Sequence, residues 1–136
     1  MPGFTTVDEV NKYIGGIFEK ALQDEGIGPK LVATGMTLRM DFSDPDSTVT
    51  IDFPQRRILT GEDAVIGADA VLSMSTDTAN RYWQGKVSLP LAMAKGKLKV
   101  GGSAAQLLKL APIAKDLYPV YVAMLKEDHR DDLVVS

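Results

Sequence analysis

The chain has 136 residues, of which 45% are hydrophobic, and this size and composition predict one folded domain rather than two domains or a disordered chain. It contains no cysteine, which excludes disulfides, thiolate metal ligands and a cysteine nucleophile. The net charge is -3, and Lys and Arg are dispersed, without the basic stripe of a nucleic-acid binder or the polybasic patch of a membrane-binding surface.

The N-terminal segment has the pattern of an amphipathic helix. Thr6 and Glu9 have the spacing of a capping box, in which each residue satisfies a backbone donor near the other. Apolar residues then recur at helical spacing, namely Val7, Val10, Ile14, Ile17, Phe18, Ala21 and Leu22. The pattern ends at Gly26 and Gly28, and a short helical turn is expected over residues 29–33.

Strands are predicted next, because apolar and polar residues alternate with a period of two. Three such segments cover residues 36–42, 49–53 and 70–74, and residues 57–60 are expected to form a further short strand after a turn at Pro54 and Gln55. In a fifth segment, Gly96, Leu98 and Val100 alternate with Lys95, Lys97 and Lys99. These lysines are expected to face solvent, where they also discourage pairing with the edge of another sheet.

Helices are expected on both sides of the fifth strand. Thr76 is a candidate N-cap for a helix that extends to about residue 84. Pro90 suits the first turn of a short helix over residues 90–94. Ser103 and Gln106 repeat the capping-box spacing at the start of another helix.

The C-terminal part combines prolines with an amphipathic stretch. Pro112 and Pro119 are expected to interrupt the helix, so that the apolar side of residues 117–125 folds back over the sheet as a movable cover. Residues 126–136 are highly charged and are expected to form a flexible tail.

Short alternating strands joined mostly by turns favour an α+β fold. We predict a five-stranded, mainly antiparallel twisted sheet, covered on one face by helices, with residues 1–136 in a single domain. The side chains expected to face the helices are Met36, Leu38, Met40, Val49, Ile51, Phe53, Leu72, Met74, Leu98 and Val100.

Two strings near the centre of the chain are distinctive. Residues 68–75 read Ala-Asp-Ala-Val-Leu-Ser-Met-Ser, and the helix after them ends in Gln-Gly-Lys at residues 84–86. Residues 94–102 read Ala-Lys-Gly-Lys-Leu-Lys-Val-Gly-Gly and precede a leucine-bearing helix. In these strings, and in the order of its other elements, the chain resembles the sterol-carrier-protein-2 family, as a single-domain member of bacterial type. It differs from the eukaryotic members in lacking their peroxisomal C-terminal tripeptide.

The resemblance implies an apolar tunnel that holds a lipid, such as a fatty acid, acyl-CoA, phospholipid or sterol-like molecule. The predicted function is therefore non-catalytic lipid binding, and whether the protein also transfers the lipid stays open. No cofactor and no metal are expected. The candidate lining residues are Phe18, Leu22, Met36, Leu38, Met40, Phe53, Leu72, Met74, Tyr82, Trp83, Leu89, Met93, Leu98, Leu107, Leu108, Leu117, Tyr121 and Met124.

Two other classes of function compete with this one. Periodicity alone would make these side chains ordinary core, which favours an interaction or dimerisation module with a closed cavity. An enzyme is the third class. The single histidine, His129, lies beside Asp128 and Arg130 in the polar tail, and no Gly-x-Ser-x-Gly motif occurs, so no catalytic residue is predicted.

The compartment and partners are predicted from what the sequence lacks. The first fifteen residues contain acids and no continuous apolar stretch, so no secretory signal is expected. No uncharged run reaches the ~20 residues of a membrane span. We therefore expect a cytoplasmic protein with a small lipid ligand, no nucleic-acid partner and at most transient membrane contact, and its oligomeric state is left open.

Overall fold

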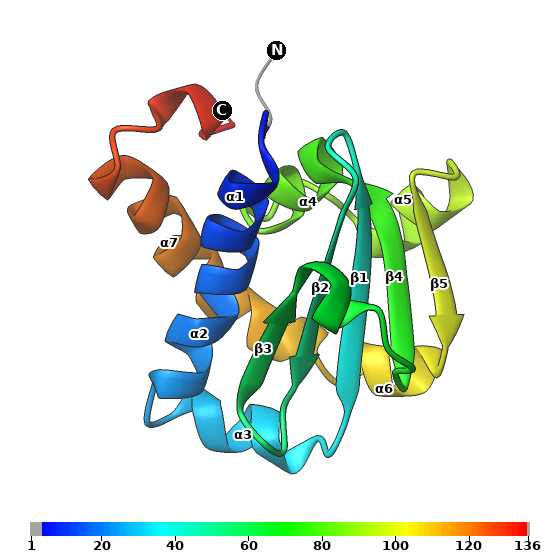
Figure 1. The fold of residues 1–136 in the computed structure, drawn as a ribbon. Helices are drawn as coiled ribbons and strands as arrows, with labels where there is room; N and C mark the ends of the chain where they lie inside the picture. Colours follow the sequence, from blue (N-terminus) through cyan, green and yellow to red (C-terminus); the bar gives the residue numbers. More distant parts are fainter. Residues whose placement is uncertain (1–3, 136) are drawn as a thin grey trace.

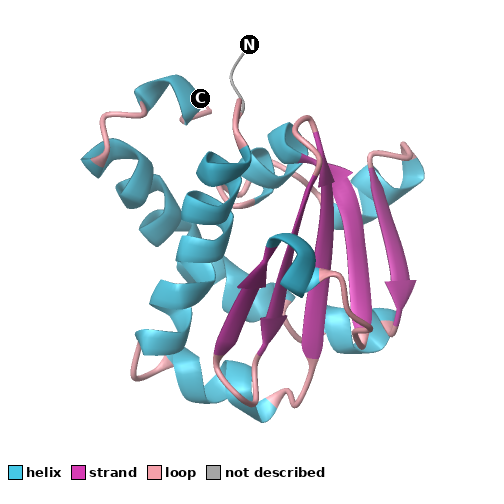
Figure 2. Cartoon of the chain, viewed as in Figure 1, coloured by secondary structure: helices cyan, strands magenta, loops and turns pink. Residues whose placement is uncertain are grey.

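The computed structural model describes residues 4–135, which form a five-stranded sheet with helices packed against it (Figures 1 and 2). The strands are β1 (Thr37–Ser43), β2 (Ser47–Asp52), β3 (Arg57–Thr60), β4 (Ala70–Ser75) and β5 (Leu98–Gly102). The α-helices are α1 (Val7–Val10), α2 (Gly16–Gln23), α3 (Ile27–Ala33), α4 (Thr76–Tyr82), α5 (Leu89–Ala94), α6 (Ala104–Leu108) and α7 (Ala111–Glu127). Three further helical segments are the π-helical η1 (Asn11–Gly15) and the 3-10 turns η2 (Gly61–Ala64) and η3 (Asp131–Leu133).

The sheet has the strand order β3-β2-β1-β4-β5. The pairings β1–β2, β2–β3 and β4–β5 are antiparallel, whereas β1 and β4 are parallel. The sheet is therefore mixed, and the prediction of a five-stranded, mainly antiparallel α+β fold is confirmed.

The two faces of the sheet differ as the alternation predicts. Of the side chains expected to face the helices, eight are buried and two are half-buried; the half-buried ones are Met74 and Val100. Lys97 and Lys99 are exposed. In Figure 1, α1, α2 and α7 lie together on one side of the sheet. The apolar core fills the space between this helical layer and the strands.

The caps explain where several helices begin. The predicted capping box at α1 is present, because the Thr6 hydroxyl accepts from the Glu9 backbone and the Glu9 carboxylate accepts from the Thr6 backbone. The N-cap of α4, however, is Ser75 rather than Thr76. The Ser75 hydroxyl accepts from the Thr78 backbone N–H at 3.1 Å.

The capping box predicted at Ser103 forms only in part. The Ser103 hydroxyl accepts from the Gln106 backbone N–H at 3.2 Å, as expected. The reciprocal bond does not form, because the Ser103 N–H donates to the Asp69 carbonyl at 2.9 Å. The Gln106 Oε1 atom is consequently buried without a hydrogen-bond partner among the described residues.

The predicted interruption at Pro119 is wrong, because Pro119 lies inside α7, a single helix of 17 residues. Pro112 occupies the first turn, where the missing N–H removes no helical hydrogen bond. On both sides of Pro119 the helix is anchored by buried side chains, Leu117 before it and Tyr121 and Leu125 after it. This packing outweighs the roughly 3 kcal/mol by which proline disfavours a helix interior.

The charged C-terminal segment, for which the sequence predicts flexibility, packs against α4 and the N-terminal helix. The Leu133 side chain is fully buried, and its carbonyl accepts from Asn80 Nδ2 and Gln84 Nε2, both at 2.9 Å. Asn80 also accepts from the Tyr121 hydroxyl at 2.7 Å. The Leu133 carbonyl thereby satisfies buried amide donors that would otherwise lack a partner.

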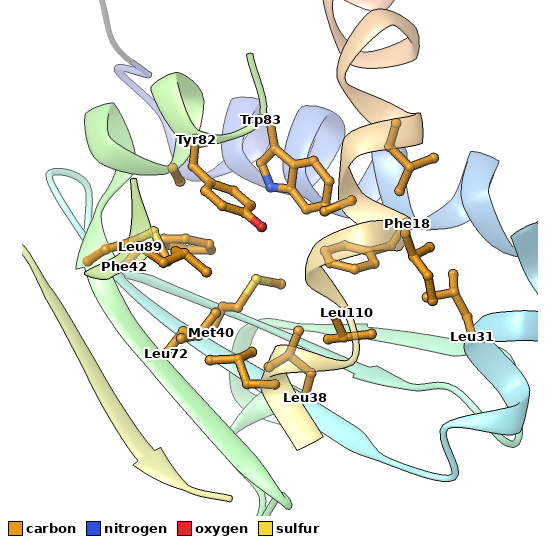
Figure 3. A pocket seen from close by; sticks show the side chains of 16 residues that line it. Phe18, Leu31, Leu38, Met40, Phe42, Leu72, Tyr82, Trp83, Leu89 and Leu110 are labelled. Atoms are coloured by element: carbon orange, nitrogen blue, oxygen red, sulfur yellow. The ribbon is translucent and has the colours of Figure 1, made fainter. Parts of the chain in front are cut away.

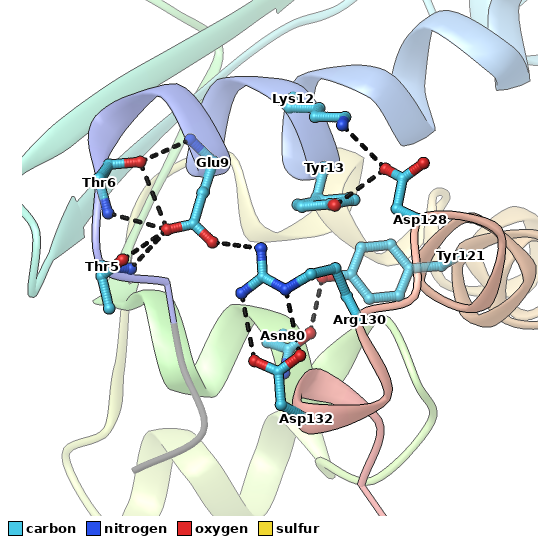
Figure 4. A network of polar contacts seen from close by, with 10 residues as sticks. All are labelled: Thr5, Thr6, Glu9, Lys12, Tyr13, Asn80, Tyr121, Asp128, Arg130 and Asp132. Atoms are coloured by element: carbon cyan, nitrogen blue, oxygen red, sulfur yellow. Dashed lines mark hydrogen bonds and ion pairs between the residues drawn. The ribbon is translucent and has the colours of Figure 1, made fainter.

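Ion pairs add to this attachment (Figure 4). Arg130 pairs with Asp132 at 3.1 Å and also with Glu9, which lies on α1. Desolvation by itself would raise the pKa of Glu9, but hydrogen bonds from Thr5 and from Arg130 outweigh it and lower this pKa to about 2.

Candidate functional site

An apolar cavity lies between the sheet and the helices (Figure 3). Its volume is about 50 Å³, counted as the space that the centre of a water molecule can occupy. Its walls come from α2, α3, β1, β4, α4, α5, α6, α7 and the turn before α7. The sixteen lining residues are Phe18, Leu31, Leu38, Met40, Phe42, Leu72, Met74, Ala79, Tyr82, Trp83, Leu89, Leu107, Leu110, Ile113, Ala114 and Leu117.

The central pair of strands forms one wall of the cavity. Side chains two apart on a strand point to the same face, which brings Leu38, Met40 and Phe42 of β1 together. The parallel register then places Leu72 of β4 beside Met40 and Met74 beside Phe42. Two methionines in this wall make it deformable, because their side chains are unbranched and polarizable.

Aromatic rings form much of the opposite wall. Trp83 meets Phe18 edge to face, with ring centroids 5.2 Å apart, and meets Tyr82 in the same way at 5.4 Å. Tyr82 in turn contacts Tyr118 of α7 at 6.0 Å. These edge-to-face contacts are the favoured geometry for aromatic pairs and orient both Tyr82 and Trp83.

The lining side chains include two polar groups capable of donating hydrogen bonds, the Tyr82 hydroxyl and the Trp83 indole N–H. Figure 3 shows both directed into the cavity. Burial raises the pKa of Tyr82 above its ordinary value, as does the neighbouring Tyr118, so the hydroxyl stays neutral and can donate. None of the described lining residues is Lys, Arg or His, so an ionised carboxylate inside would have no counter-charge.

The side chains that line the cavity are not equally enclosed. Met74, Tyr82, Leu89 and Ile113 are only half-buried, whereas Leu38 and Leu31 on deeper walls are 2% exposed. Beside Leu89 on the same helix, Leu91 is 53% exposed. We therefore take this side as the mouth.

The structure brings together ten of the eighteen predicted lining residues around the cavity. These are Phe18, Leu38, Met40, Leu72, Met74, Tyr82, Trp83, Leu89, Leu107 and Leu117. Six others pack elsewhere in the core or against it, namely Leu22, Met36, Phe53, Leu98, Tyr121 and Met124. Met93 and Leu108 are exposed, at 47% and 68%.

Six lining residues were not among the sequence-based candidates: Leu31, Phe42, Ala79, Leu110, Ile113 and Ala114. Phe42 continues the alternation of β1 and could have been found from that pattern. Ala79 and Ala114 carry no such signal, because their small side chains contribute space rather than contact. The space itself depends on helix packing that periodicity does not describe.

Fold and site together define an α+β domain built around an apolar cavity. The sequence profile of the SCP-2 sterol transfer family matches residues 17–115, which is well over half of the chain. The chain therefore belongs to the SCP-2 sterol transfer family, whose domains bind and transfer lipids and are in general not catalytic. No curated protein matches the sequence.

Solved structures with a similar fold include several sterol carrier proteins. The sterol carrier protein domain 2 of Helicoverpa armigera has a TM-score of 0.65 and 15% identity, covering 82% of this chain and 89% of that one. The apo sterol carrier protein 2 of Yarrowia lipolytica has a TM-score of 0.65 and 18% sequence identity, and the match covers 84% of this chain and 97% of that one. Palmitated SCP2L2 of Aedes aegypti has a TM-score of 0.59 and 17% sequence identity, and the match covers 77% of this chain and 93% of that one. At these identities the likeness concerns the fold. Among the described residues, no helix is both long and apolar enough to cross a membrane.

Proposed function

We propose that this protein binds the hydrocarbon chain of one lipid molecule in the apolar cavity and carries out no reaction on it. The observation that carries the proposal is the lining, in which sixteen side chains present hydrocarbon and only two neutral donors. Membership of a lipid-binding family supports it, and one similar fold is that of a palmitated protein. A cytoplasmic location and release of the lipid to membranes stay predictions.

The charges determine how such a ligand would lie. A carboxylate or phosphate costs several kcal/mol to bury without a partner, and no cation lines the cavity. A charged head group would therefore stay at the mouth beside Leu89, with the hydrocarbon chain inside. A neutral hydroxyl or ester oxygen could instead enter and accept from Tyr82 or Trp83.

The size of the cavity sets a condition on binding. A volume of about 50 Å³ holds only a few waters, since each needs roughly 10–15 Å³ by the same measure. A long acyl chain is larger, so the walls must move outward when it enters. Burial of a chain of about 16 carbons offers roughly 12 kcal/mol. Association and ordering cost several kcal/mol, which leaves micromolar-order binding.

Two measurements test the proposal. Native mass spectrometry of the protein purified from cells, followed by lipid extraction, should reveal bound lipid. Titration of the delipidated protein with a fluorescent fatty acid, displaced by natural fatty acids, should show one saturable site. Absence of both would favour an interaction module with a closed cavity.

A cavity-filling variant assigns binding to this site. Ala114→Leu adds three carbons to the lining, and we expect at least tenfold weaker fatty-acid binding because the space is lost. Ala123→Leu is the matched control, since it is exposed on the same helix. Thermal unfolding confirms that both variants are folded. Equal affinity in the two variants would place the ligand elsewhere.

A further inference from the structure

The charge of this protein is divided unequally along the chain. Residues 78–115 hold seven of its fifteen Lys and Arg and none of its eighteen Asp and Glu. The rest of the chain is correspondingly acidic. The net charge of -3 does not reveal this basic segment, because it sums the basic residues 78–115 and the acidic remainder of the chain.

The fold places most of these cations along one edge of the sheet. In Figure 1, β5 forms the edge strand farthest from α1, with α5 near one end of this strand and α6 near the other. Five lysines in or beside these elements are all exposed, and we call them the basic edge: Lys86, Lys95, Lys97, Lys99 and Lys109.

The basic edge has uncompensated charge. Within residues 4–135, none of its five lysines forms an ion pair. Two carboxylates, those of Asp41 and Asp77, border the same surface depressions as these lysines. Each is already paired, Asp41 with Arg39 at 2.9 Å and Asp77 with Arg81 at 3.0 Å.

Exposed apolar side chains lie among these lysines. Leu91 borders a surface depression together with Lys86, Lys95 and Lys97. Met93 of the same helix is 47% exposed, and Leu108, next to Lys109, is 68% exposed. Half of the large hydrophobic side chains that are exposed in the described chain therefore lie on the basic edge or beside it.

We propose that the basic edge docks on the surface of an anionic phospholipid membrane, with Leu91, Met93 and Leu108 inserted among the lipids. Lysine ammonium groups are attracted to phosphate and carboxylate head groups, and apolar side chains between them gain from entering the interface. The mouth of the cavity opens beside Leu89 on the same helix, so a docked membrane would face it. This inference goes beyond lipid binding and requires no ligand in the cavity.

Binding to vesicles tests the charge contribution. The delipidated protein should bind phosphatidylcholine vesicles that contain about one-third phosphatidylserine, should not bind pure phosphatidylcholine, and should be released by salt. Each lysine near such a surface contributes about fivefold to affinity, so the triple variant Lys86→Gln, Lys95→Gln and Lys97→Gln should bind about a hundredfold more weakly.

A matched control separates this surface from net charge. Lys20, Lys30 and Lys126 are exposed on other elements, and replacing all three with Gln changes the net charge by the same amount. The proposal requires this control to bind vesicles within about twofold of the wild type. Equal weakening of both triple variants, or no binding of the wild type to anionic vesicles, would overturn it. Binding to duplex RNA without vesicle binding would do the same.

The apolar contribution has its own pair of variants. Leu91→Ser with Met93→Ser should weaken vesicle binding by about tenfold, because the inserted apolar area is lost. Val65→Ser with Ile66→Ser removes exposed apolar side chains outside the basic edge and should leave binding unchanged. Fatty-acid displacement should be unaffected in the lysine triple variant, so a failure of docking is distinguishable from a failure of the cavity.

Discussion

Replacing Leu133 with Ala tests how firmly the C-terminal segment is held. The substitution removes three carbons from a side chain that is 0% exposed, while its carbonyl still accepts from Asn80 and Gln84. Buried Leu→Ala changes cost roughly 2–5 kcal/mol. Because a segment near the chain end can relax toward the space left behind, we expect a loss at the lower end, about 2–3 kcal/mol.

Urea unfolding measures this loss through the fluorescence of Trp83, the single tryptophan, which is 5% exposed. With an m-value of about 2 kcal/mol per molar urea, the midpoint should fall by roughly 1–1.5 M. Leu108→Ala removes the same atoms from a side chain that is 68% exposed and should change stability by less than about 0.5 kcal/mol. Equal midpoints for the two variants would show that Leu133 does not pack against the core.

Three further predictions concern pH, backbone and ligand. The pKa of Glu9, about 2 when folded, lies below its ordinary 4.5, so its stabilisation is present above about pH 4.5 and is lost as pH falls toward 2. Glu9→Gln should abolish this part of the pH dependence in urea unfolding. Gly102→Ala should cost at least about 2 kcal/mol in the same assay, because φ is +77° and the added Cβ would overlap the backbone carbonyl oxygen of Asp69. Gly67→Ala should not destabilise the protein in this way, because the added Cβ would meet open space and φ is not positive there. A bound fatty acid should slow amide hydrogen exchange in α5 and α6 more than in residues 117–126, and the reverse pattern would locate the movable wall in α7.

Local patterns determine how far the fold can be predicted from the sequence. Alternation of apolar and polar residues identifies four of the five strands because one face of the sheet is buried, and the lysines of β5 mark its other face, whereas β3 does not alternate. The helix after β4 illustrates the limit, since adjacent Ser75 and Thr76 are both good caps and tertiary contacts decide between them. Thr76 donates to the Asp44 carbonyl across the fold, which leaves Ser75 as the cap.

The cavity is less predictable for a related reason. Apolar residues that line a cavity and apolar residues that fill a core have the same periodicity, so Leu38 and Ile51 give the same signal, although only Leu38 lines the cavity. Whether an apolar side chain lines a cavity or fills the core depends on the size of the side chains on the opposite layer. Where these are small, as at Ala79 and Ala114, space is left between the layers. Only the family resemblance predicted a cavity, because it conveys the packing of whole elements.

The small size of the cavity and the charge of the basic edge concern the same part of the molecule. A long acyl chain enters only if a wall moves, and the wall that moves at least cost is the one that buries least apolar surface. In α5 only Ala92 is buried, whereas α7 is anchored by Ala114, Leu117, Tyr121 and Leu125. Displacing α5 would widen the mouth beside Leu89 and bring its exposed Leu91 and Met93 outward. A membrane that attracts the adjoining lysines would stabilise this open form, because it contacts the displaced helix and offers its apolar side chains a lipid environment.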